Sequence, residues 1–377
     1  MIVAGETSGD ALGADLMQAL KEQTGEVMVT GIGGPKMAAQ GLASIFPMSE
    51  IALMGLKEIL PRLPKLFRLV DDAAEHALAT SPDAIVLIDS PEFNHRVAKR
   101  VKAVRPDIPI LCYVAPHVWA WRQGRARKMK KYFDAVMAFL PFEPDVFAAN
   151  DGPPCHFVGH PMIDRLAAFE PLPAFSKKAG IRANDKPLIV LPGSRLSEVN
   201  VLVPVFGEVL QRLDRQVEGV RPIIPLVPHM AEKVRELTAD WPGNPIYVED
   251  DAEKLAAFKE ARAALAASGT ATMELALAGL PTTVAYKMGL MGDILVRTMP
   301  VPSVVLVNLI LDAPAMPEFL QDRCHVDDIT PCIRAMLDDD EINAHYRAML
   351  ASFGEEMRYQ GQPPAHRAAA LTLDFAS

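Results

Sequence analysis

The chain has 377 residues, half of them hydrophobic, and its formal net charge is −9 at pH 7. At roughly 150 residues per domain this length predicts about two domains, and the acidic balance argues against general nucleic-acid binding. The four cysteines show no CxxC spacing, which argues against a zinc site or a redox pair and favours a reducing cytosol. No apolar run approaches the ~20 residues of a membrane span.

Short apolar runs alternate with amphipathic stretches along the whole chain. We expect one series of strands at 1–4, 27–32, 84–88, 109–114 and 135–138. A second series is expected at 188–191, 222–226, 246–248, 263–266 and 282–285. The stretches between them have helical spacing, as at 11–22 and 92–105. This alternation predicts an α/β protein with two doubly wound parallel sheets.

The proline-punctuated segment 159–175 is interpreted as the linker between the two domains. We therefore expect a first domain at 1–165 and a second at 166–354. The final segment, about 355–377, has helical spacing. We expect it to pack back on the first domain.

Polar residues that follow the strands of the first series are candidate site residues, because ligands of such sheets bind beyond the carboxyl ends of the strands. Gly5 and Gly9 would let a ligand approach closely, and Thr7 or Ser8 would cap the next helix. Glu6 is either a helix-start carboxylate or a ligand contact. Asp89, directly after the strand at 84–88, is either a general base for a substrate hydroxyl or a turn and N-cap residue.

Two turns of the second series have the composition of anion sites. In the first, 192–195, backbone N–H groups at a helix start and the fork of Arg195 suit phosphate oxygens. In the second, 268–270, a similar turn opens a helix in which Glu274 could accept the hydroxyls of a ribose. The alternative is a pair of ordinary capped helices. Together the two turns predict a nucleotide diphosphate whose charge the protein stabilises without a metal.

Two further segments are rich in positive charge. One combines it with apolar residues, and the other contains no acidic residue. The segment 54–70 either rests on an anionic membrane surface or packs as an amphipathic helix, and Pro61 and Pro64 argue against one long helix. The segment 121–131 carries six basic residues and no acidic one. It either holds a phosphate or lipid head group or forms a solvated helix face.

Ten short strings stand in the order found in one enzyme family, the lipid-A-disaccharide synthases. They run from residue 4 to residue 321: "AGETSGDALGA", "GIGGPKM", "MGLKEIL", "IDSPEFN", "YVAPHVWAWR", "LPFE", "VGHPM", "LPGSR", "SGTATMELAL" and "PEFLQ". The chain resembles this family from residue 1 to about 321. It departs from the usual pattern at His117 and at Val307, which affects the detail of two loops.

The resemblance implies a GT-B glycosyltransferase that works with inversion and needs neither cofactor nor metal. It would transfer 2,3-diacylglucosamine from UDP to the 6-hydroxyl of 2,3-diacylglucosamine 1-phosphate, giving a β-1,6 disaccharide 1-phosphate and UDP for lipid A. It also implies a peripheral enzyme on the cytoplasmic face of the inner membrane, sometimes a homodimer, with no nucleic-acid partner. The alternatives are a UDP-N-acetylglucosamine epimerase, another lipid-linked sugar transferase and a non-catalytic membrane-docking protein.

The resemblance also implies roles for individual residues. Asp89 would be the general base, with Glu6 beside it in the catalytic cleft. The expected donor contacts are Gly193, Ser194, Arg195, Ser268, Gly269, Thr270, Glu274, Asn308 and Gln321. The expected acceptor and membrane contacts are Met54, Leu56, Lys57, Arg62, Leu63, Lys65, Leu66, Phe67, Arg68, Arg122 and Arg125.

Overall fold

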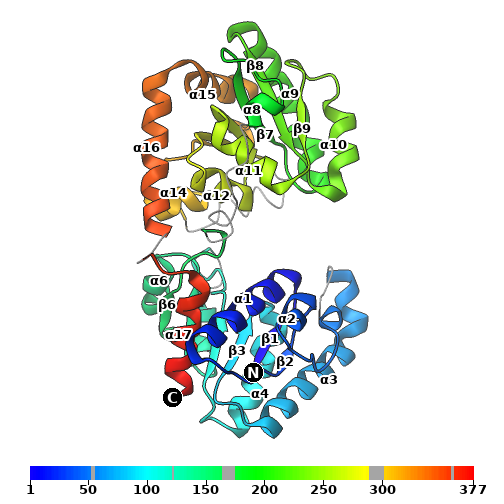
Figure 1. The fold of residues 1–377 in the computed structure, drawn as a ribbon, viewed down its shortest axis with the longest axis vertical. Helices are drawn as coiled ribbons and strands as arrows, with labels where there is room; N and C mark the ends of the chain where they lie inside the picture. The colour runs from blue at the N-terminus through cyan, green and yellow to red at the C-terminus, as the bar shows by residue number, and fades with distance from the viewer. Residues whose placement is uncertain (52–55, 121–122, 164–174, 288–300, 358–360) are drawn as a thin grey trace. The chain divides into compact units, whose positions relative to one another are not determined.

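The computed structural model describes residues 1–51, 56–120, 123–163, 175–287, 301–357 and 361–377, with the backbone alone for 56–63. The chain divides into two compact units (Figure 1). Unit 1 comprises Met1–Pro161 with Arg358–Ser377, and unit 2 comprises Met162–Met357. Each unit is built on one six-stranded sheet, called sheet A in unit 1 and sheet B in unit 2. All strand pairs in both sheets are parallel, so the predicted α/β class is confirmed.

Unit 1 alternates strands and helices and receives its last helix from the end of the chain. Sheet A has the strand order β2-β1-β3-β4-β5-β6. Its elements are β1 (Ile2–Ala4), α1 (Thr7–Thr24), β2 (Gly31–Ile32), α2 (Pro35–Ala39), η1 (Met48–Glu50), α3 (Leu56–Thr80), β3 (Ile85–Ile88), α4 (Pro91–Val104), β4 (Ile110–Tyr113), α5 (Gly124–Met129), β5 (Ala135–Ala138), α6 (Glu143–Ala149), β6 (Cys155–Phe157) and α17 (Pro364–Ala376).

Unit 2 repeats the alternation and ends in two long helices. Sheet B has the strand order β12-β11-β10-β7-β8-β9. Its elements are α8 (Phe175–Lys178), β7 (Lys186–Leu191), α9 (Leu196–Gln216), β8 (Val220–Pro225), η2 (Pro228–Met230), α10 (Ala231–Thr238), β9 (Ile246–Val248), α11 (Asp251–Glu260), β10 (Ala263–Ala267), α12 (Thr270–Leu277), β11 (Thr282–Tyr286), α14 (Leu306–Leu311), β12 (Glu318–Leu320), η3 (Gln321–Arg323), α15 (Val326–Asp338) and α16 (Asp340–Met357).

The expected strands agree with the observed ones except at the sheet edges. The predictions at 135–138 and 246–248 coincide with β5 and β9. β2 is shorter than expected, and Met28, just before it, is 90% exposed. The outer strands β6 and β12 were not predicted, because each has only three residues and carries a polar one, His156 or Glu318, instead of an apolar run.

Helices cover both faces of sheet A because its strands are apolar on both sides. Ile85 and Leu87 of β3 belong to the same core as α3 and α4, whereas Val86 and Ile88 belong to the core that includes α1 and α17. Strands buried on both faces are typical of parallel sheets with helical crossovers. The residue that ends such a strand is therefore held in place by two packed cores.

The last helix of the chain completes unit 1. In Figure 1, α17 (red) lies beside α1 (blue). Ala368 and Ala369 of α17 are fully buried in the core that contains Leu16 and Leu20 of α1. At the rim of this contact, Gln23 Nε2 donates a hydrogen bond of 2.8 Å to the carbonyl of His366.

Helix α3 corrects one expectation from the sequence. It is a single 25-residue helix that runs through both Pro61 and Pro64. The part after the prolines buries Leu66, Val70 and Ala77 in the unit 1 core. This apolar stripe at helical spacing stabilises the helix despite the hydrogen bonds that proline cannot donate.

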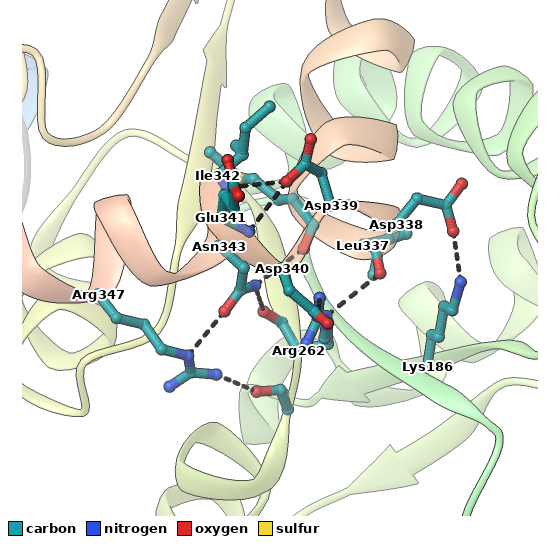
Figure 2. A network of polar contacts seen from close by, with 12 residues as sticks. Lys186, Arg262, Leu337, Asp338, Asp339, Asp340, Glu341, Ile342, Asn343 and Arg347 are labelled. Atoms are coloured by element: carbon teal, nitrogen blue, oxygen red, sulfur yellow. Dashed lines mark hydrogen bonds and ion pairs between the residues drawn. The ribbon is translucent and has the colours of Figure 1, made fainter.

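In unit 2, a buried polar network fixes α16 to the sheet (Figure 2). Asn343, only 4% exposed, donates to the carbonyls of Arg262 and Met336 at 2.8 Å each. Arg347 donates to the Asn343 carbonyl oxygen at 2.9 Å and to the backbone carbonyls of Gly279 and Ala261. Satisfied buried networks of this kind favour one packing arrangement over others.

Candidate functional site

The carboxyl edge of sheet A brings together three titratable side chains from neighbouring strands. Glu6 follows β1, Asp89 follows β3, and His117 lies in the loop after β4, and these strands are adjacent in the sheet. Partial burial and the charge of Asp89 raise the pKa of Glu6. Burial lowers the pKa of His117, and the Asp89 charge opposes that shift. Asp89 is thus the charge that affects the pKa of both neighbours.

The backbone at Asp89 is strained. Asp89 and Ser90 have φ values of 50° and 40°, and Val114 on the next loop has a φ of 83°. Each such residue costs on the order of 1–3 kcal/mol, and such strain clusters at functional sites. Asn94 stabilises the turn, because its Nδ2 donates to the carbonyls of Ile88 and Asp89 at 3.0 and 2.8 Å. Sequence reasoning missed this role of Asn94.

The turn conformation confirms that Asp89 is a turn residue and tests whether it also caps the helix. The N-cap of α4 is Ser90, not Asp89, and its side chain makes no capping hydrogen bond. The Asp89 carboxylate makes no hydrogen bond to another residue that the structure describes. The interpretation of Asp89 as an N-cap is therefore wrong, and its carboxylate remains open to a ligand.

The glycines of the first turn have a role in packing. A Cβ atom on Gly5 would lie 2.8 Å from the Ser90 Cβ, so only glycine lets the β1–α1 turn pass the strained β3–α4 turn. This close approach is what brings Glu6 beside Asp89. A Cβ atom on Gly9 would lie 3.3 Å from the Ala4 Cβ and 3.6 Å from an Ile88 methyl, a milder constraint, and close approach of a substrate to the two glycines stays a prediction.

The start of α1 also differs from expectation. The helix begins at Thr7, its N-cap is Glu6, and no side chain caps it, so the prediction that Thr7 or Ser8 caps the helix is wrong. Asp10, by contrast, is 1% exposed and accepts hydrogen bonds of 2.8–3.0 Å from the backbone N–H groups of Gly34, Lys36 and Met37. Asp10 therefore holds the N-terminus of α2 and is not available to a ligand.

The first anion turn of unit 2 already contains a carboxylate. Glu198 Oε2 accepts the backbone N–H of Ser194 at 3.0 Å, and its Oε1 lies 3.0 Å from the guanidinium of Arg195. Gly193 has a φ of 115°, and a Cβ there would lie 2.6 Å from the Glu198 Cβ. The prediction that the Ser194 N–H is free for a phosphate is thus wrong. The Arg195 side chain is still 75% exposed and remains able to bind an anion.

The second anion turn is open. Gly269 is the N-cap of α12, and among the described residues no side chain caps this helix and no atom lies within 4 Å of a Cβ placed on Gly269. Ser268 and Thr270 flank it after β10, next to β7 in the sheet. Glu274 of α12 lies 3.2 Å from the ammonium of Lys254, and although burial opposes it, this carboxylate raises the pKa of Lys254. Sequence reasoning missed Lys254.

Two other residues that we expected to contact the sugar donor, Asn308 and Gln321, lie in different surroundings. Asn308 is 7% exposed, and its side chain exchanges two hydrogen bonds of 2.8 Å with the backbone of Met316. Its observed role is to hold the loop before β12, not to face a ligand. Gln321 directly follows β12 with a φ of 52°, at the same carboxyl edge of sheet B as Arg195 and Ser268.

The expected membrane residues divide by their exposure. Phe67 is 41% exposed and Arg68 is exposed, whereas Leu66 is 4% exposed in the core, so its expected membrane contact is wrong. Lys65 forms an ion pair with Glu50, and Arg125 forms one of 3.0 Å with Glu92. Met54 and Arg122 lie outside the described residues, and only the helical backbone is described at Leu56, Lys57, Arg62 and Leu63.

Comparison with known proteins decides the family. A family model described as lipid-A-disaccharide synthetase matches residues 1–365. The lipid-A-disaccharide synthase of Rhodopseudomonas palustris (strain HaA2) is 44% identical over 378 residues, covering 99% of this chain and 95% of that protein. The chain belongs to the lipid-A-disaccharide synthase family. The synthase of Rhodospirillum centenum, another member, is 43% identical, covering 99% of this chain and 93% of its own.

Solved structures place this member of the synthase family in the GT-B fold. The MurG of Acinetobacter baumannii gives a TM-score of 0.59 at 16% identity, with 99% of both chains covered. A UDP-GlcNAc 2-epimerase from Neisseria meningitidis, bound to UDP-GlcNAc, gives 0.61 at 11% identity, with 99% and 98% covered. At such low identity these likenesses show the fold alone. Family membership therefore makes the chain a glycosyltransferase, and the epimerase alternative has only the shared fold in its favour.

Two side chains that sequence reasoning missed, Glu198 and His229, contact the first anion turn of unit 2 at Ser194. Glu198 is the third residue after the N-cap Arg195, and a Glu at this spacing can accept the backbone N–H of the N-cap residue, as its Oε2 does here at 3.3 Å. His229, in η2 after β8, has its Nε2 3.0 Å from the Ser194 carbonyl oxygen. No local signal in the sequence would have joined His229 to a turn 35 residues away. Among the described helices, none is at once long and apolar enough to cross a bilayer.

Proposed function

We propose that this glycosyltransferase moves 2,3-diacylglucosamine from UDP to the 6-hydroxyl of 2,3-diacylglucosamine 1-phosphate. The products are a β-1,6-linked disaccharide 1-phosphate and UDP. Membership of the lipid-A-disaccharide synthase family supports this reaction. The observation that carries it is the Glu6–Asp89 pair at the carboxyl edge of sheet A, where an open carboxylate lies beside a carboxyl whose pKa is raised.

In the proposed mechanism Asp89 is the general base. It accepts the proton of the 6-hydroxyl, the freed oxygen attacks the anomeric carbon of the donor, and the bond from that carbon to the UDP oxygen breaks with inversion. A positioned base of this kind contributes about 10²–10⁴-fold to the rate. Glu6, which lies beside Asp89 and whose pKa is raised by burial and by that charge, would hydrogen-bond a sugar hydroxyl.

We propose that unit 2 binds the donor. The exposed Arg195 guanidinium and the open N-terminus of α12 would neutralise the charge that develops on UDP, so that no metal is needed. Glu274, placed by Lys254, would accept ribose hydroxyls. Two fold relatives support a nucleotide in this architecture, since one epimerase was solved with UDP-GlcNAc and MnaA of S. aureus with UDP.

Both proposed substrates carry acyl chains, so the enzyme must meet them at a lipid surface. We propose peripheral binding to the cytoplasmic face of the inner membrane through α3, where exposed Phe67 lies next to exposed Arg68. A homodimer stays a prediction from the family resemblance.

The test is a UDP-release assay with purified protein. We expect UDP only when both the UDP donor and the 2,3-diacylglucosamine 1-phosphate are present in detergent micelles. UDP-N-acetylglucosamine alone serves as the control for the epimerase alternative, and conversion of its sugar would contradict the proposal. Release of UDP with acceptors that are not glucosamine lipids would contradict the assigned acceptor.

A further inference from the structure

A cavity of about 520 Å³ in unit 1 has no role in the mechanism above. It lies between α4 and α5 and starts at Pro91, two residues after Asp89. Arg96 is five residues further along α4, about 8 Å along the helix axis. That length is comparable to one sugar ring.

The cavity is strongly basic in an acidic chain. Four cations line it, Arg96, Lys99, Arg125 and Lys128, against one carboxylate, Glu92. Glu92 pairs with Arg96 and Arg125, which lower its pKa although burial opposes them. Lys99 and Lys128 make no ion pair with any residue that the structure describes. The Lys99 ammonium lies 5.1 Å from the centroid of the Tyr132 ring, and no described carboxylate neutralises either lysine.

The floor of the cavity includes a hydrogen-bonding group without a partner. His95 is 9% exposed, and its Nδ1 lies 2.9 Å from the Tyr132 hydroxyl. Its Nε2 is buried and has no hydrogen-bond partner among the described residues. An unsatisfied buried polar atom costs on the order of 1–3 kcal/mol. Protein atoms cover this nitrogen, so His95 contributes a polar wall to the cavity and its Nε2 is not a ligand contact in this conformation.

The cavity also adjoins apolar surface. The Arg96 guanidinium lies over the ring of Phe67, 5.7 Å from its centroid. Phe67 is an exposed apolar residue of α3, and at 41% exposure it presents part of its ring to solvent. An anion held at Arg96 would thus sit next to a surface suited to hydrocarbon.

We propose that this cavity binds the phosphate of an amphiphilic phosphosugar. Resting on the function proposed above, its occupant is the 1-phosphate of the acceptor, which the cavity holds while Asp89 faces the 6-hydroxyl. Charged hydrogen bonds to phosphate give both affinity and orientation. The same phosphate chemistry is offered by membrane lipid head groups, and the experiment separates the two sources.

The test compares Lys99→Gln/Lys128→Gln with Lys131→Gln. All three lysines are exposed, so the variants should fold, and Lys131 does not line the cavity. The probe is glucosamine 1-phosphate, titrated by NMR against each full-length protein, with glucosamine as the phosphate-free control. We expect the double variant to lose at least about tenfold in affinity. Lys131→Gln should match the parent, and UDP affinity should be equal in all three.

Two results would overturn the proposal. One is equal glucosamine 1-phosphate binding by the parent and the double variant. The other is no binding of this probe together with lysine-dependent binding to phosphatidylglycerol vesicles, which would make the cavity a head-group site. Because the titration needs no turnover, it stands even if the UDP-release assay fails, and the two proposals can fail separately.

Discussion

The carboxyl edges of the two sheets hold carboxylates in opposite electrostatic settings. At sheet A, Glu6 and Asp89 lie together with no cation paired to either among the described residues, and the pKa of Glu6 is raised. At sheet B, Glu198 is paired with Arg195 and Glu274 with Lys254. Carboxyls that share a site without a cation are suited to proton transfer, because their charge is costly. Paired carboxylates are suited to positioning donors.

The backbone shows the same contrast. Sheet A carries positive φ values at Asp89, Ser90 and Val114, whereas the two anion turns of sheet B have glycine at their positive-φ positions, Gly193 and Gly269. Among the candidate site residues of unit 2, only Gln321, after β12, is a strained non-glycine. Side chains in strained positions are kept where their chemistry is needed. This contrast supports the proposal that the general base lies in unit 1 and the donor site in unit 2, and the following changes test it.

The largest effect is expected from Asp89→Asn, which removes the base and keeps the shape. The rate of UDP release should fall by about 10²–10⁴-fold, while UDP affinity, measured by calorimetry, should stay the same. Asn94→Asp is the control for the turn. It keeps the Asp89 carboxylate and removes only the amide donor that binds the carbonyls of Ile88 and Asp89. Near-normal turnover of Asp89→Asn would show that Asp89 is not the general base.

The next effect concerns a third carboxyl at sheet A. Glu143, which follows β5, is 2% exposed, and burial raises its pKa from 4.5 to about 8 against opposing hydrogen bonds. The folded protein therefore keeps a proton that the unfolded chain releases between these values. Stability is fully present below about pH 4.5 and is lost as the pH rises to 8, by roughly 4 kcal/mol.

Glu143→Gln should remove this loss, because the amide does not titrate. Urea unfolding at pH 5 and pH 8.5 measures the difference in the free energy of unfolding for the parent and the variant. Glu75→Gln, at an exposed position of α3, is the control and should unfold like the parent. A parent whose stability is equal at both pH values would contradict the shifted pKa.

At sheet B we expect Arg195→Ala to weaken UDP binding by about ten- to a hundredfold. The substitution removes the guanidinium N–H donors proposed to bind the phosphates, and it leaves the Glu198 carboxylate next to them without its ion-pair partner. Arg235→Ala removes an arginine of α10 that pairs with Glu249, and it should bind UDP like the parent. Unchanged affinity of Arg195→Ala by calorimetry would take this residue out of the donor site.

The smallest effect is expected at the surface of α3. Phe67→Ser with Arg68→Gln should reduce binding to phosphatidylglycerol vesicles by about tenfold, since one aromatic side chain and one charge leave the interface. Val104→Ser, which changes an exposed apolar residue at the end of α4, is the matched control. Equal sedimentation of all three proteins with the vesicles would place the membrane contact elsewhere.

The sequence was sufficient for features that depend on local pattern. The strands, their parallel arrangement and the residues that end them follow from apolar periodicity, and so Asp89 and Glu6 were found at one edge. Which residues hydrogen-bond to or pack against one another was not predictable, because these contacts join residues that are distant in the chain. Asp10 reaches residues 34–37, and Gly5 reaches Ser90.

The corrections in unit 2 have the same origin. Glu198 could have been recognised from its spacing to Arg195, but not that it fills the turn offered to a phosphate. Asn308 matches a motif position, yet its hydrogen bonds go to Met316. On α3, periodicity marks an apolar stripe without saying that Leu66 faces the core and Phe67 the solvent.

The packing of α17 on α1 has a consequence for synthesis on the ribosome. Ala368 and Ala369 complete a core whose other members come from the first 160 residues. The amino-terminal half emerges first but lacks one wall until translation reaches the final helix. Unit 2, whose residues lie between these parts, can finish folding earlier, and a nascent chain stalled before residue 364 would leave the α1 face uncovered for chaperones.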